Sequence, residues 1–428
     1  MTALKSVAFH TLGCKLNYSE TATLSRTLQA DGFVKKDFEE EADVYVINTC
    51  SVTENADKEC RMIVRRIQKR APQAMVVITG CYAQLKPQEI AKIEGVDLVL
   101  GAAEKFNLSA HLKEITKGPA DGGRAKICSC DIEEVAGFHS SFSMNDRTRA
   151  FLKVQDGCDY NCSFCTIPLA RGHSRSDSIE GVLQNMRTLA ANGTKEIVLT
   201  GINLGDFGKG INGGKTKDSS FFDLIQAMDE EPGIDRIRIS SIEPNLLSNE
   251  VIEFVARSRR FMPHFHIPLQ SGSNKILALM RRRYQRELYE DRVAAIKELM
   301  PHCCIGADVI VGFPSESDDD FKDTYDFLHR IDVSYLHVFT YSERANTLAP
   351  GIKPIVPMHI RNERNKALRN LSYQKMQYFT EQHHGTTRPV LFEMPGPNGM
   401  LEGFTDNYIK VQTPFRPEWE KQMVDWVL

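Results

Sequence analysis

Short apolar runs rich in β-branched residues alternate with helical patterns along most of the chain. In the N-terminal part the runs are residues 6–13, 44–50 and 75–81, separated by helical patterns at 18–32 and 54–70. Such runs are typical of parallel strands buried on both faces, which need a crossover helix between them. The alternation therefore predicts an α/β fold that begins with an open parallel sheet in residues 1–140.

A second alternation follows a polar, turn-rich stretch. Its candidate strands are residues 151–157, 196–201, 236–242, 264–270, 305–313 and 335–342. Six βα units are fewer than the eight of a closed barrel, so we expect a partial (β/α)6 barrel within residues 145–378. In such a barrel the reactive groups lie on loops at the carboxyl ends of the strands.

The final part of the chain is predicted to form a small β-barrel. After a helical pattern at 360–385, the β-rich runs 390–394, 399–405 and 408–413 are interrupted by Pro and Gly. This pattern is typical of small all-β modules, and we assign it to residues 380–428. Because the chain stops soon after the last run, the final strand is expected to be short or missing.

Composition argues against several classes of protein. A net charge of −3 disfavours indiscriminate nucleic-acid binding, although it allows local basic patches. No apolar run is long enough to span a bilayer, and the first residues lack the apolar core of a secretory signal. We therefore expect a cytoplasmic protein, in which eleven cysteines indicate metal binding rather than disulfides.

Three cysteines follow three predicted strands. Cys14, Cys50 and Cys81 each stand at the carboxyl end of one strand. In an open α/β sheet these ends share one edge, so the three thiols are expected to gather there. The alternative is that they are buried structural residues, because a free cysteine is a common core residue. We favour a metal site.

Three further cysteines lie within one loop. The stretch "DGCDYNCSFC" places Cys158, Cys162 and Cys165 within eight positions, directly after a predicted strand. Structural zinc and iron sites normally take four protein ligands. A zinc knuckle would need a fourth ligand, but the nearest histidine, His173, lies eight residues further on.

The C-x3-C-x2-C spacing resembles the signature of the radical S-adenosylmethionine (SAM) enzymes. This resemblance implies that Cys158, Cys162 and Cys165 hold three irons of a [4Fe–4S] cluster, whose fourth iron binds SAM. It also implies an adenine contact at Phe164 and a methionine contact at Gly201 and Asn203, where Asn203 replaces the family's acid. Further strand ends carry short polar residues or an accessible glycine backbone that suit the same pocket: Ser240, Ser241, Glu243, Gln270 and Gly312.

The two cysteine sets together resemble the methylthiotransferases, which replace a C–H bond with C–SCH3. The matching phrases are "TLGCKLN", "NTCSVTENAD", "TGCYAQ" and "DGCDYNCSFCTIPLARG". The resemblance implies a second, auxiliary [4Fe–4S] cluster at Cys14, Cys50 and Cys81, with an open iron for the sulfur or methylthio group. "GCKLN", "LTGINLGDFG" and "RIRISSIEP" look most like the bacterial branch that modifies carbon 2 of N6-threonylcarbamoyladenosine beside the anticodon of tRNA.

The resemblance also implies partners. The C-terminal part is similar to the family's TRAM module, an RNA-binding barrel, and a flavodoxin or ferredoxin is expected to supply electrons. Two basic groups agree with a tRNA partner, namely the helical stripe Lys58, Arg61, Arg65 and Lys69, and the run Arg281, Arg282 and Arg283 before Tyr284. The stripe could instead be a solvated helix face. Arg344, at the end of the sixth barrel strand, suits the threonyl carboxylate.

Other functions are open at this point. The same chemistry could act on isopentenyladenosine in tRNA or on an aspartate of a ribosomal protein. A non-catalytic, zinc-bearing RNA-binding protein and a degenerate radical enzyme that no longer docks tRNA are further alternatives. The remaining cysteines are expected to be structural: Cys60, Cys128, Cys130, Cys303 and Cys304.

Overall fold

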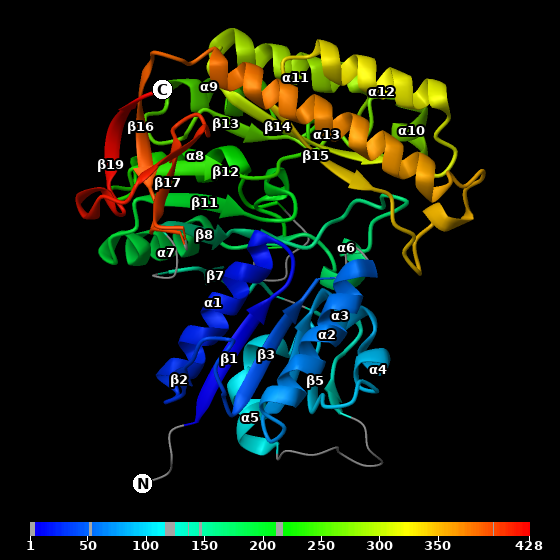
Figure 1. Ribbon diagram of the computed structural model, residues 1–428, viewed down its shortest axis with the longest axis vertical. Helices are drawn as coiled ribbons and strands as arrows, with labels where there is room; N and C mark the ends of the chain where they lie inside the picture. The colour runs from blue at the N-terminus through cyan, green and yellow to red at the C-terminus, as the bar shows by residue number, and fades with distance from the viewer. Residues whose placement is uncertain are drawn as a thin grey trace.

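The computed structural model describes residues 5–50, 54–115, 125–135, 137–144, 148–210, 217–396 and 398–428, and for residues 54–57 it describes the backbone alone. Figure 1 shows the N-terminal α/β sheet packed against one side of a half-open barrel. The C-terminal strands, drawn in red, lie against another side of that barrel.

The N-terminal sheet has its strands in the order β2-β1-β3-β4-β5-β6, and every pair is parallel. The strands are β1 (Ser6–Thr11), β2 (Val34–Lys35), β3 (Val44–Thr49), β4 (Met75–Gly80), β5 (Leu98–Leu100) and β6 (Lys126–Cys128). The helices are α1 (Lys15–Ala30), α2 (Glu54–Arg70), α3 (Cys81–Leu85), α4 (Pro87–Ile90) and α5 (Leu108–Glu114). The predicted open parallel sheet is confirmed.

Helices cover both faces of this sheet. On one face, α2 packs through Ile63, Val64 and Ile67 against the β3 and β4 side chains. On the other face, α1 packs through Leu24 and Leu28. Because both faces are covered, the central strands are apolar throughout rather than alternating, which is why they appear as continuous apolar runs in the sequence.

Six parallel strands form the barrel in the order β8-β11-β12-β13-β14-β15, in which parallel bridges join β12 to β13. They are β8 (Arg149–Lys153), β11 (Glu196–Thr200), β12 (Arg236–Ile239), β13 (His264–His266), β14 (Cys304–Val311) and β15 (Tyr335–Thr340). Short strands at the start of the barrel are β7 (Ser141–Phe142), β9 (Gln155–Asp156) and β10 (Arg175–Ser176). The predicted partial (β/α)6 barrel is confirmed.

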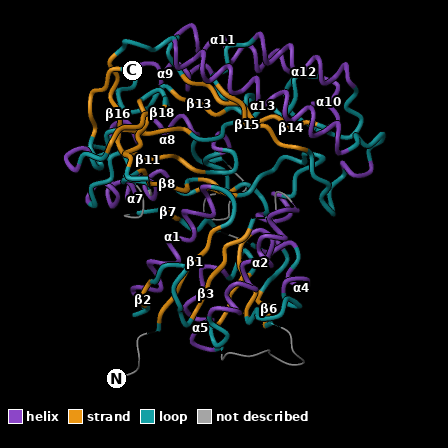
Figure 2. Tube along the Cα trace, viewed as in Figure 1, coloured by secondary structure: helices purple, strands orange, loops and turns teal. Residues whose placement is uncertain are grey.

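Helices line the outside of the barrel, as Figure 2 shows. They are α7 (Ile179–Ala191), α8 (Phe221–Glu230), α9 (Asn249–Arg257), α10 (Asn274–Leu279), α11 (Arg286–Leu299), α12 (Asp318–Arg330) and α13 (Met358–Glu381). The short helix α6 (Ile167–Arg171) instead packs on α3 of the N-terminal part. The buried apolar side chains of the barrel strands and of α7, α8, α9, α11, α12 and α13 form one core, and those of α10 belong to a smaller cluster. The long helix α13 packs along β15 and leads into the C-terminal sheet.

The C-terminal residues form a four-stranded antiparallel sheet in the order β18-β17-β16-β19. Its strands are β16 (Thr387–Phe392), β17 (Met400–Thr405), β18 (Lys410–Pro414) and β19 (Met423–Val427). Strand β19 pairs with β16 from Thr387 to Leu391. This pairing corrects the expectation that the last strand is short or missing.

Two buried arginines of β12 attach this sheet to the barrel. Arg236 donates a hydrogen bond to the carbonyl of Pro389 (2.6 Å). Arg238 donates to the carbonyls of Thr405 (2.7 Å) and Asp406 (2.8 Å). Charged donors of this kind are among the stronger protein hydrogen bonds, so the C-terminal sheet is held firmly at one end of the barrel strands.

None of the helices in the described ranges is both long enough and apolar enough to cross a membrane.

Candidate functional site

The loop that carries Cys158, Cys162 and Cys165 lies between β9 and α6 and is anchored at several points. The Cys158 N–H donates to the carbonyl of Gly172 (3.0 Å). In the middle of the loop, the Ser163 N–H donates to the carbonyl of Met280 (3.1 Å), at the end of α10. The carbonyl of Ser163 accepts from the Ala349 N–H (2.7 Å). These contacts fix the loop at the carboxyl end of the barrel.

The three loop thiols lie close enough to affect one another. Burial raises the pKa of Cys158 to about 12, and the charges of Cys165 and Cys162 add to this effect. Burial also raises the pKa of Cys165 to about 12. Three thiolates in one place are therefore unfavourable without a cation, which is the environment that a metal ion or cluster stabilises.

Two hydrogen-bond donors point at the sulfur atoms of this loop. The Tyr160 N–H donates to Cys158 Sγ (3.4 Å), and the Arg282 guanidinium donates to Cys162 Sγ (3.2 Å). Donors to ligating sulfurs are a common way in which proteins stabilise iron–sulfur clusters and set their potentials. The residues present therefore fit a cluster with three thiolate ligands.

The structure also brings Cys14, Cys50 and Cys81 to one edge of the N-terminal sheet. Cys14 precedes α1, Cys50 follows β3 and Cys81 begins α3, at the carboxyl ends of the neighbouring strands β1, β3 and β4. Gly13, with φ +102°, lies against Cys50: a Cβ atom there would be 2.9 Å from its Sγ. Burial raises the pKa of Cys81, and the nearby Cys14 charge adds to it.

Helix α6 connects the two cysteine sets. It begins two residues after Cys165, and it packs on α3, which begins at Cys81. Arg171, the last residue of α6, is 3% exposed and donates to Asn17 Oδ1 of α1 (2.5 Å). The distance between the two cysteine sets is therefore fixed by a short helix and a buried contact.

A buried cluster of charges holds the sheet and the barrel together. Glu20 of α1 is 0% exposed and forms ion pairs with Lys105 (2.7 Å), Lys153 (3.1 Å) and Arg171 (3.2 Å). Asp156 pairs with Arg171 from the barrel side (2.9 Å). Burial opposes the charge of Glu20, but the three cations outweigh it and hold the pKa of Glu20 well below its usual range.

The predicted methionine-contacting residues lie near the loop cysteines. The N–H groups of Ile202 and Asn203 donate to Gln155 Oε1 (2.8 and 2.9 Å), which shapes the turn after Gly201. The Asn203 side chain is buried, donates to Asp206 (3.3 Å) and leaves its Oδ1 without a hydrogen-bond partner among the described residues. Asp206, whose charge contributes to the raised pKa of Cys158, is a nearby acid that the sequence did not reveal.

Arg282 links Glu243 to the cysteine loop. Arg282 forms an ion pair with Glu243 and also contacts Cys162, and its side chain is 4% exposed. Burial raises the pKa of Glu243, and Arg282 opposes this shift. Ser240 is buried at the end of β12, and the Ser241 backbone bridges to His266. Sequence reasoning placed Arg282 on an RNA-facing surface, whereas the structure places it beside Cys162.

A cavity of about 310 Å³ brings together Phe164, Cys165, Gln270 and Arg344. Its wall is completed by Asp308 and Ile310 of β14 and by the end of β15. Gly312, with φ +73°, lies outside this lining. A Cβ atom at Gly312 would be 2.2 Å from Cγ of Arg361, so this glycine makes room for an arginine, and its predicted adenine contact stays a prediction.

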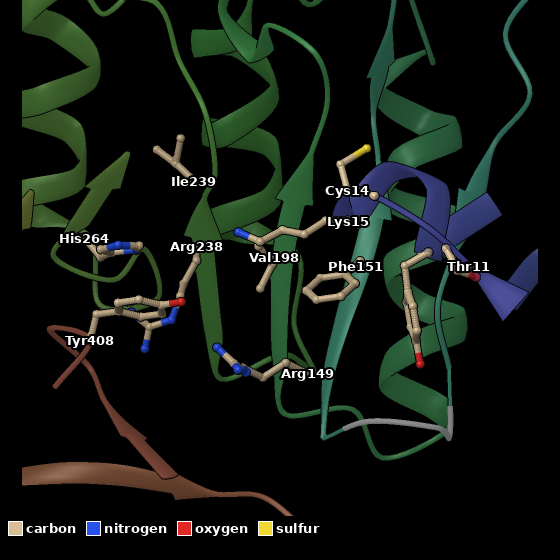
Figure 3. Close-up of a pocket in the computed structure, with 12 residues that line it drawn as sticks. Thr11, Cys14, Lys15, Arg149, Phe151, Val198, Arg238, Ile239, His264 and Tyr408 are labelled. Atoms are coloured by element: carbon tan, nitrogen blue, oxygen red, sulfur yellow. The ribbon is translucent and has the colours of Figure 1, made fainter. Parts of the chain in front are cut away.

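A second cavity, of about 380 Å³, lies where the start of α1 meets the barrel (Figure 3). Its lining combines Cys14, three cations and several aromatic rings: Thr11, Gly13, Cys14, Lys15, Tyr18, Arg149, Phe151, Val198, Arg238, Ile239, His264 and Tyr408. Burial lowers the pKa of Lys15, and the positive charges of Arg149 and Arg238 lower it further. The cavity is therefore electropositive and borders one of the sheet-edge thiols.

Three side chains from neighbouring barrel strands lie close together, and one of them, His337, is exposed. His266 of β13 contacts Asp308 of β14 (Nε2 to Oδ1, 2.7 Å), and the His266 and His337 rings are 5.2 Å apart. Their ligand atoms all lie within 4.8 Å of one another. No spacing in the sequence indicates this group, because each residue comes from a separate strand.

The basic residues predicted to meet RNA have different environments. Arg61, Arg65 and Lys69 of α2 line a groove of about 700 Å³, and Arg61 pairs there with Glu89. Lys58 is exposed one turn earlier on the same helix. These residues form a surface stripe, as the sequence predicts.

The second basic group is only partly on the surface. Arg281 is exposed, and Arg283 is exposed with its guanidinium 4.0 Å from the Tyr160 ring centre. Tyr284 is 7% exposed, and its hydroxyl donates to the carbonyls of Pro268 and Leu269 (both 2.8 Å). Tyr284 is therefore not available to stack on a base, which corrects the sequence interpretation.

The five remaining cysteines differ in how far they are buried. Cys60, Cys303 and Cys304 are 0% exposed, whereas Cys128 and Cys130 are partly exposed. Burial raises the pKa of Cys128 and of Cys130, so neither is an activated thiolate at neutral pH.

Comparison with known proteins identifies both cysteine-bearing parts of the chain. Residues 6–101 match the family described as uncharacterized protein family UPF0004, and residues 152–328 match the radical SAM superfamily. The solved structure of the radical SAM methyltransferase TsrM from Kitasatospora setae is similar in fold, with a TM-score of 0.57 and 16% identity. The match covers 78% of this chain and 75% of TsrM.

Two curated relatives resemble almost the whole chain. The threonylcarbamoyladenosine tRNA methylthiotransferase MtaB of Bacillus subtilis is 40% identical, over 95% of this chain and 90% of the relative. MtaB of Aquifex aeolicus is 41% identical, over 95% of this chain and 96% of the relative. With matches of this extent over both cysteine-bearing parts, the chain belongs to the radical SAM methylthiotransferase family.

Proposed function

We propose that this protein transfers a methylthio group to carbon 2 of the adenine in N6-threonylcarbamoyladenosine, beside the anticodon of tRNA. The observation that carries the proposal is the 40% identity to MtaB of Bacillus subtilis along 95% of the chain. The protein is a transferase whose cofactors are SAM and two [4Fe–4S] clusters. The presence of two cysteine triads, each at the carboxyl edge of parallel strands, supports this function.

Six thiolates would hold the clusters. Cys158, Cys162 and Cys165 would bind the cluster that carries SAM. Cys14, Cys50 and Cys81 would bind the auxiliary one. When bound, these groups supply the electron, the deoxyadenosyl radical and the methylthio sulfur that the transfer requires. Helix α6 follows the loop triad and packs on the helix that begins at Cys81, so the two triads lie on adjoining elements, as a shared substrate requires.

Residues near the loop cysteines would bind SAM. The cavity of Phe164 and Gln270 borders Cys165, and its mostly apolar wall suits an adenine ring. Gly201, Asn203, Ser240, Ser241, Glu243 and Gly312 remain proposed contacts to the rest of the cofactor. Arg282 has a positioning role, since it contacts both Cys162 and Glu243.

Each of the three parts of the chain would have a separate role in the reaction. We assign residues 1–140 to the auxiliary cluster, 145–378 to the radical SAM domain and 380–428 to a TRAM-like RNA-binding module. Surface Arg281, Arg283 and the α2 stripe would contact tRNA phosphates. A cytoplasmic location and a flavodoxin or ferredoxin as electron donor are in keeping with this chemistry.

One anaerobic assay tests the function. The reconstituted protein, SAM and a reductant are incubated with three acceptors: tRNA carrying threonylcarbamoyladenosine, tRNA carrying isopentenyladenosine, and the ribosomal protein. Mass spectrometry should find the methylthio group on threonylcarbamoyladenosine alone. Iron and sulfide analysis should find about eight of each per chain. Stoichiometric zinc without iron, or a product only on another acceptor, would contradict the proposal.

A further inference from the structure

The cavity at the start of α1 contains a cation that has no hydrogen-bond partner among the described residues. Lys15 follows Cys14 directly and begins the helix, and Figure 3 shows its side chain extending away from Cys14 into the cavity. In the described part of the chain Lys15 makes no hydrogen bond or ion pair, although the charge of Asp308 acts on it from a distance. Protein surrounds the side chain, and solvent reaches it through the cavity. An ammonium in this position is free to bind a ligand.

The other cations of the cavity are already engaged. Arg149 forms an ion pair with Glu393 (2.7 Å). Arg238 forms one with Glu196 (2.8 Å) and also bonds to the C-terminal sheet. They contribute positive potential to the cavity, but their donors are used for protein contacts. A bound anion would therefore form an ion pair with Lys15, and the positive charges of the two arginines would attract it from a longer distance.

The volume of the cavity and the residues of its remaining wall indicate which class of ligand can bind there. A volume of about 380 Å³ suits a small organic group rather than a lone ion. Phe151 and Val198 offer apolar contact, and Thr11 adds a hydroxyl group whose hydrogen is donated to Thr21 (2.8 Å). The ligand should thus combine one carboxylate with a short chain. A threonyl group attached to a base has this composition.

Position relative to the cysteines supports the same ligand. Gly13 and Cys14 line this cavity, so a group held there lies against Cys14, one of the three sheet-edge thiols. Arg344, which the sequence suggested as the carboxylate partner, instead lines the other cavity, with Phe164 and Cys165. The substituent on N6 is attached to the same adenine base that contains carbon 2. A substituent held beside Cys14 would place the adenine ring on the side of the auxiliary site.

We infer that Lys15 binds the carboxylate of the threonylcarbamoyl group and thereby selects threonylcarbamoyladenosine over adenosines with an apolar N6 substituent. This inference rests on the proposed function. Its physical basis is the cost of covering an ammonium with hydrocarbon: an isopentenyl group would remove water from Lys15 without replacing its hydrogen bonds. A carboxylate supplies that partner and forms a charged hydrogen bond.

The test compares RNAs that differ only in the charge of the substituent. Anticodon stem-loops carry threonylcarbamoyladenosine, its methyl ester, or isopentenyladenosine. The cluster-loaded wild type should bind the acid about 10- to 100-fold more tightly than the ester, the range expected for one charged hydrogen bond. Lys15→Gln should lose that difference, while Lys15→Arg should retain most of it.

Two controls separate this role from others. Lys35→Gln removes a charge from β2, in the same domain but outside the cavity, and should bind like the wild type. Iron and sulfide contents of Lys15→Gln should equal those of the wild type. Loss of auxiliary iron in Lys15→Gln would assign Lys15 to the cluster and overturn the inference.

The outcomes also separate the inference from the proposed function. If the wild type methylthiolates threonylcarbamoyladenosine and Lys15→Gln retains the preference for acid over ester, the inference fails and the function stands. If the wild type modifies only isopentenyladenosine, the function itself fails. A preference that disappears in Arg344→Gln but persists in Lys15→Gln would move the carboxylate site to the other cavity.

Discussion

Arg171 of the barrel and Glu20 of the N-terminal sheet form a fully buried ion pair, with Nη1 3.2 Å from Oε1. Arg171 ends the short helix that follows Cys165, and Glu20 lies on the helix that follows Cys14. The pair therefore joins the two segments that carry the two cysteine sets.

Replacing Glu20 with Gln should destabilise the protein strongly. The change leaves Lys105, Lys153 and Arg171 buried with less counter-charge, which typically costs about 3–5 kcal/mol. Denaturant unfolding of the variant measures this loss. The control is Glu180→Gln, which breaks an ion pair with Arg187 in which the Glu180 side chain is 73% exposed. It should change stability by less than about 1 kcal/mol. Equal effects of the two changes would contradict a structural role for the buried cluster.

The same carboxylates predict the response to acid. The pKa values of Glu20 and Asp156 are held below their usual values of 4.5 and 3.8, because cations outweigh the effect of burial. A depressed pKa in the folded state stabilises the protein above the unfolded pKa, and this stability is lost as the pH falls toward the folded one. Urea midpoints should therefore be steady down to about pH 5 and then fall steeply. Stability that rises on acidification below that point would be inconsistent with this cluster.

Gly13 should be needed for the auxiliary site. A Cβ atom at this position would lie 2.6 Å from Cβ and 2.9 Å from Sγ of Cys50, so Gly13→Ala must displace that cysteine. The variant should lose about half of the bound iron while keeping SAM cleavage. Gly32→Ala is the matched control, because Gly32 has a similar φ of +89° but nothing within 4 Å of the added atom. It carries the same backbone strain, about 1 kcal/mol or more, and should keep all its iron. Normal iron in both variants would show that Cys50 has room to move.

Arg282 should control the reactivity of the loop cluster. Arg282→Leu removes the donor to Cys162 Sγ and the partner of Glu243. Loss of a positive charge and of a hydrogen bond to a ligating sulfur lowers the reduction potential, and SAM cleavage should slow by about 10-fold or more. A redox titration followed by electron paramagnetic resonance should show a shift in one cluster only. The exposed neighbour Arg281→Leu should leave that potential unchanged, and an equal shift in both variants would count against the assignment.

Much of the fold follows from local patterns. Strands β3 and β4 are buried along their whole length and β1 over its first half, so each contains an apolar run that can be recognised without knowledge of its partners. The gathering of Cys14, Cys50 and Cys81 follows from one rule, since parallel neighbours end at the same edge. Strands of two or three residues, such as β2 and β5, are too short to show a pattern, and only pairing with longer neighbours creates them.

The site was harder to predict wherever it depends on tertiary contacts. Arg282 looks like a surface residue in the run of three arginines, and only the approach of the cysteine loop to α10 shows that it is buried beside Cys162. Lys15 and the group of His266, Asp308 and His337 were missed for the same reason. Each is brought to its neighbours by strands or helices far apart in the sequence.

The two triads are proposed to act on one substrate, and a single anaerobic reaction tests this directly. A variant in which Cys14, Cys50 and Cys81 are all replaced by Ala is incubated with SAM, reductant and tRNA carrying threonylcarbamoyladenosine. Mass spectrometry then quantifies 5′-deoxyadenosine and the methylthio nucleoside together. We predict that 5′-deoxyadenosine is formed and that no methylthio nucleoside appears. Formation of the methylthio nucleoside by this variant would contradict a transfer site at the edge of the N-terminal sheet.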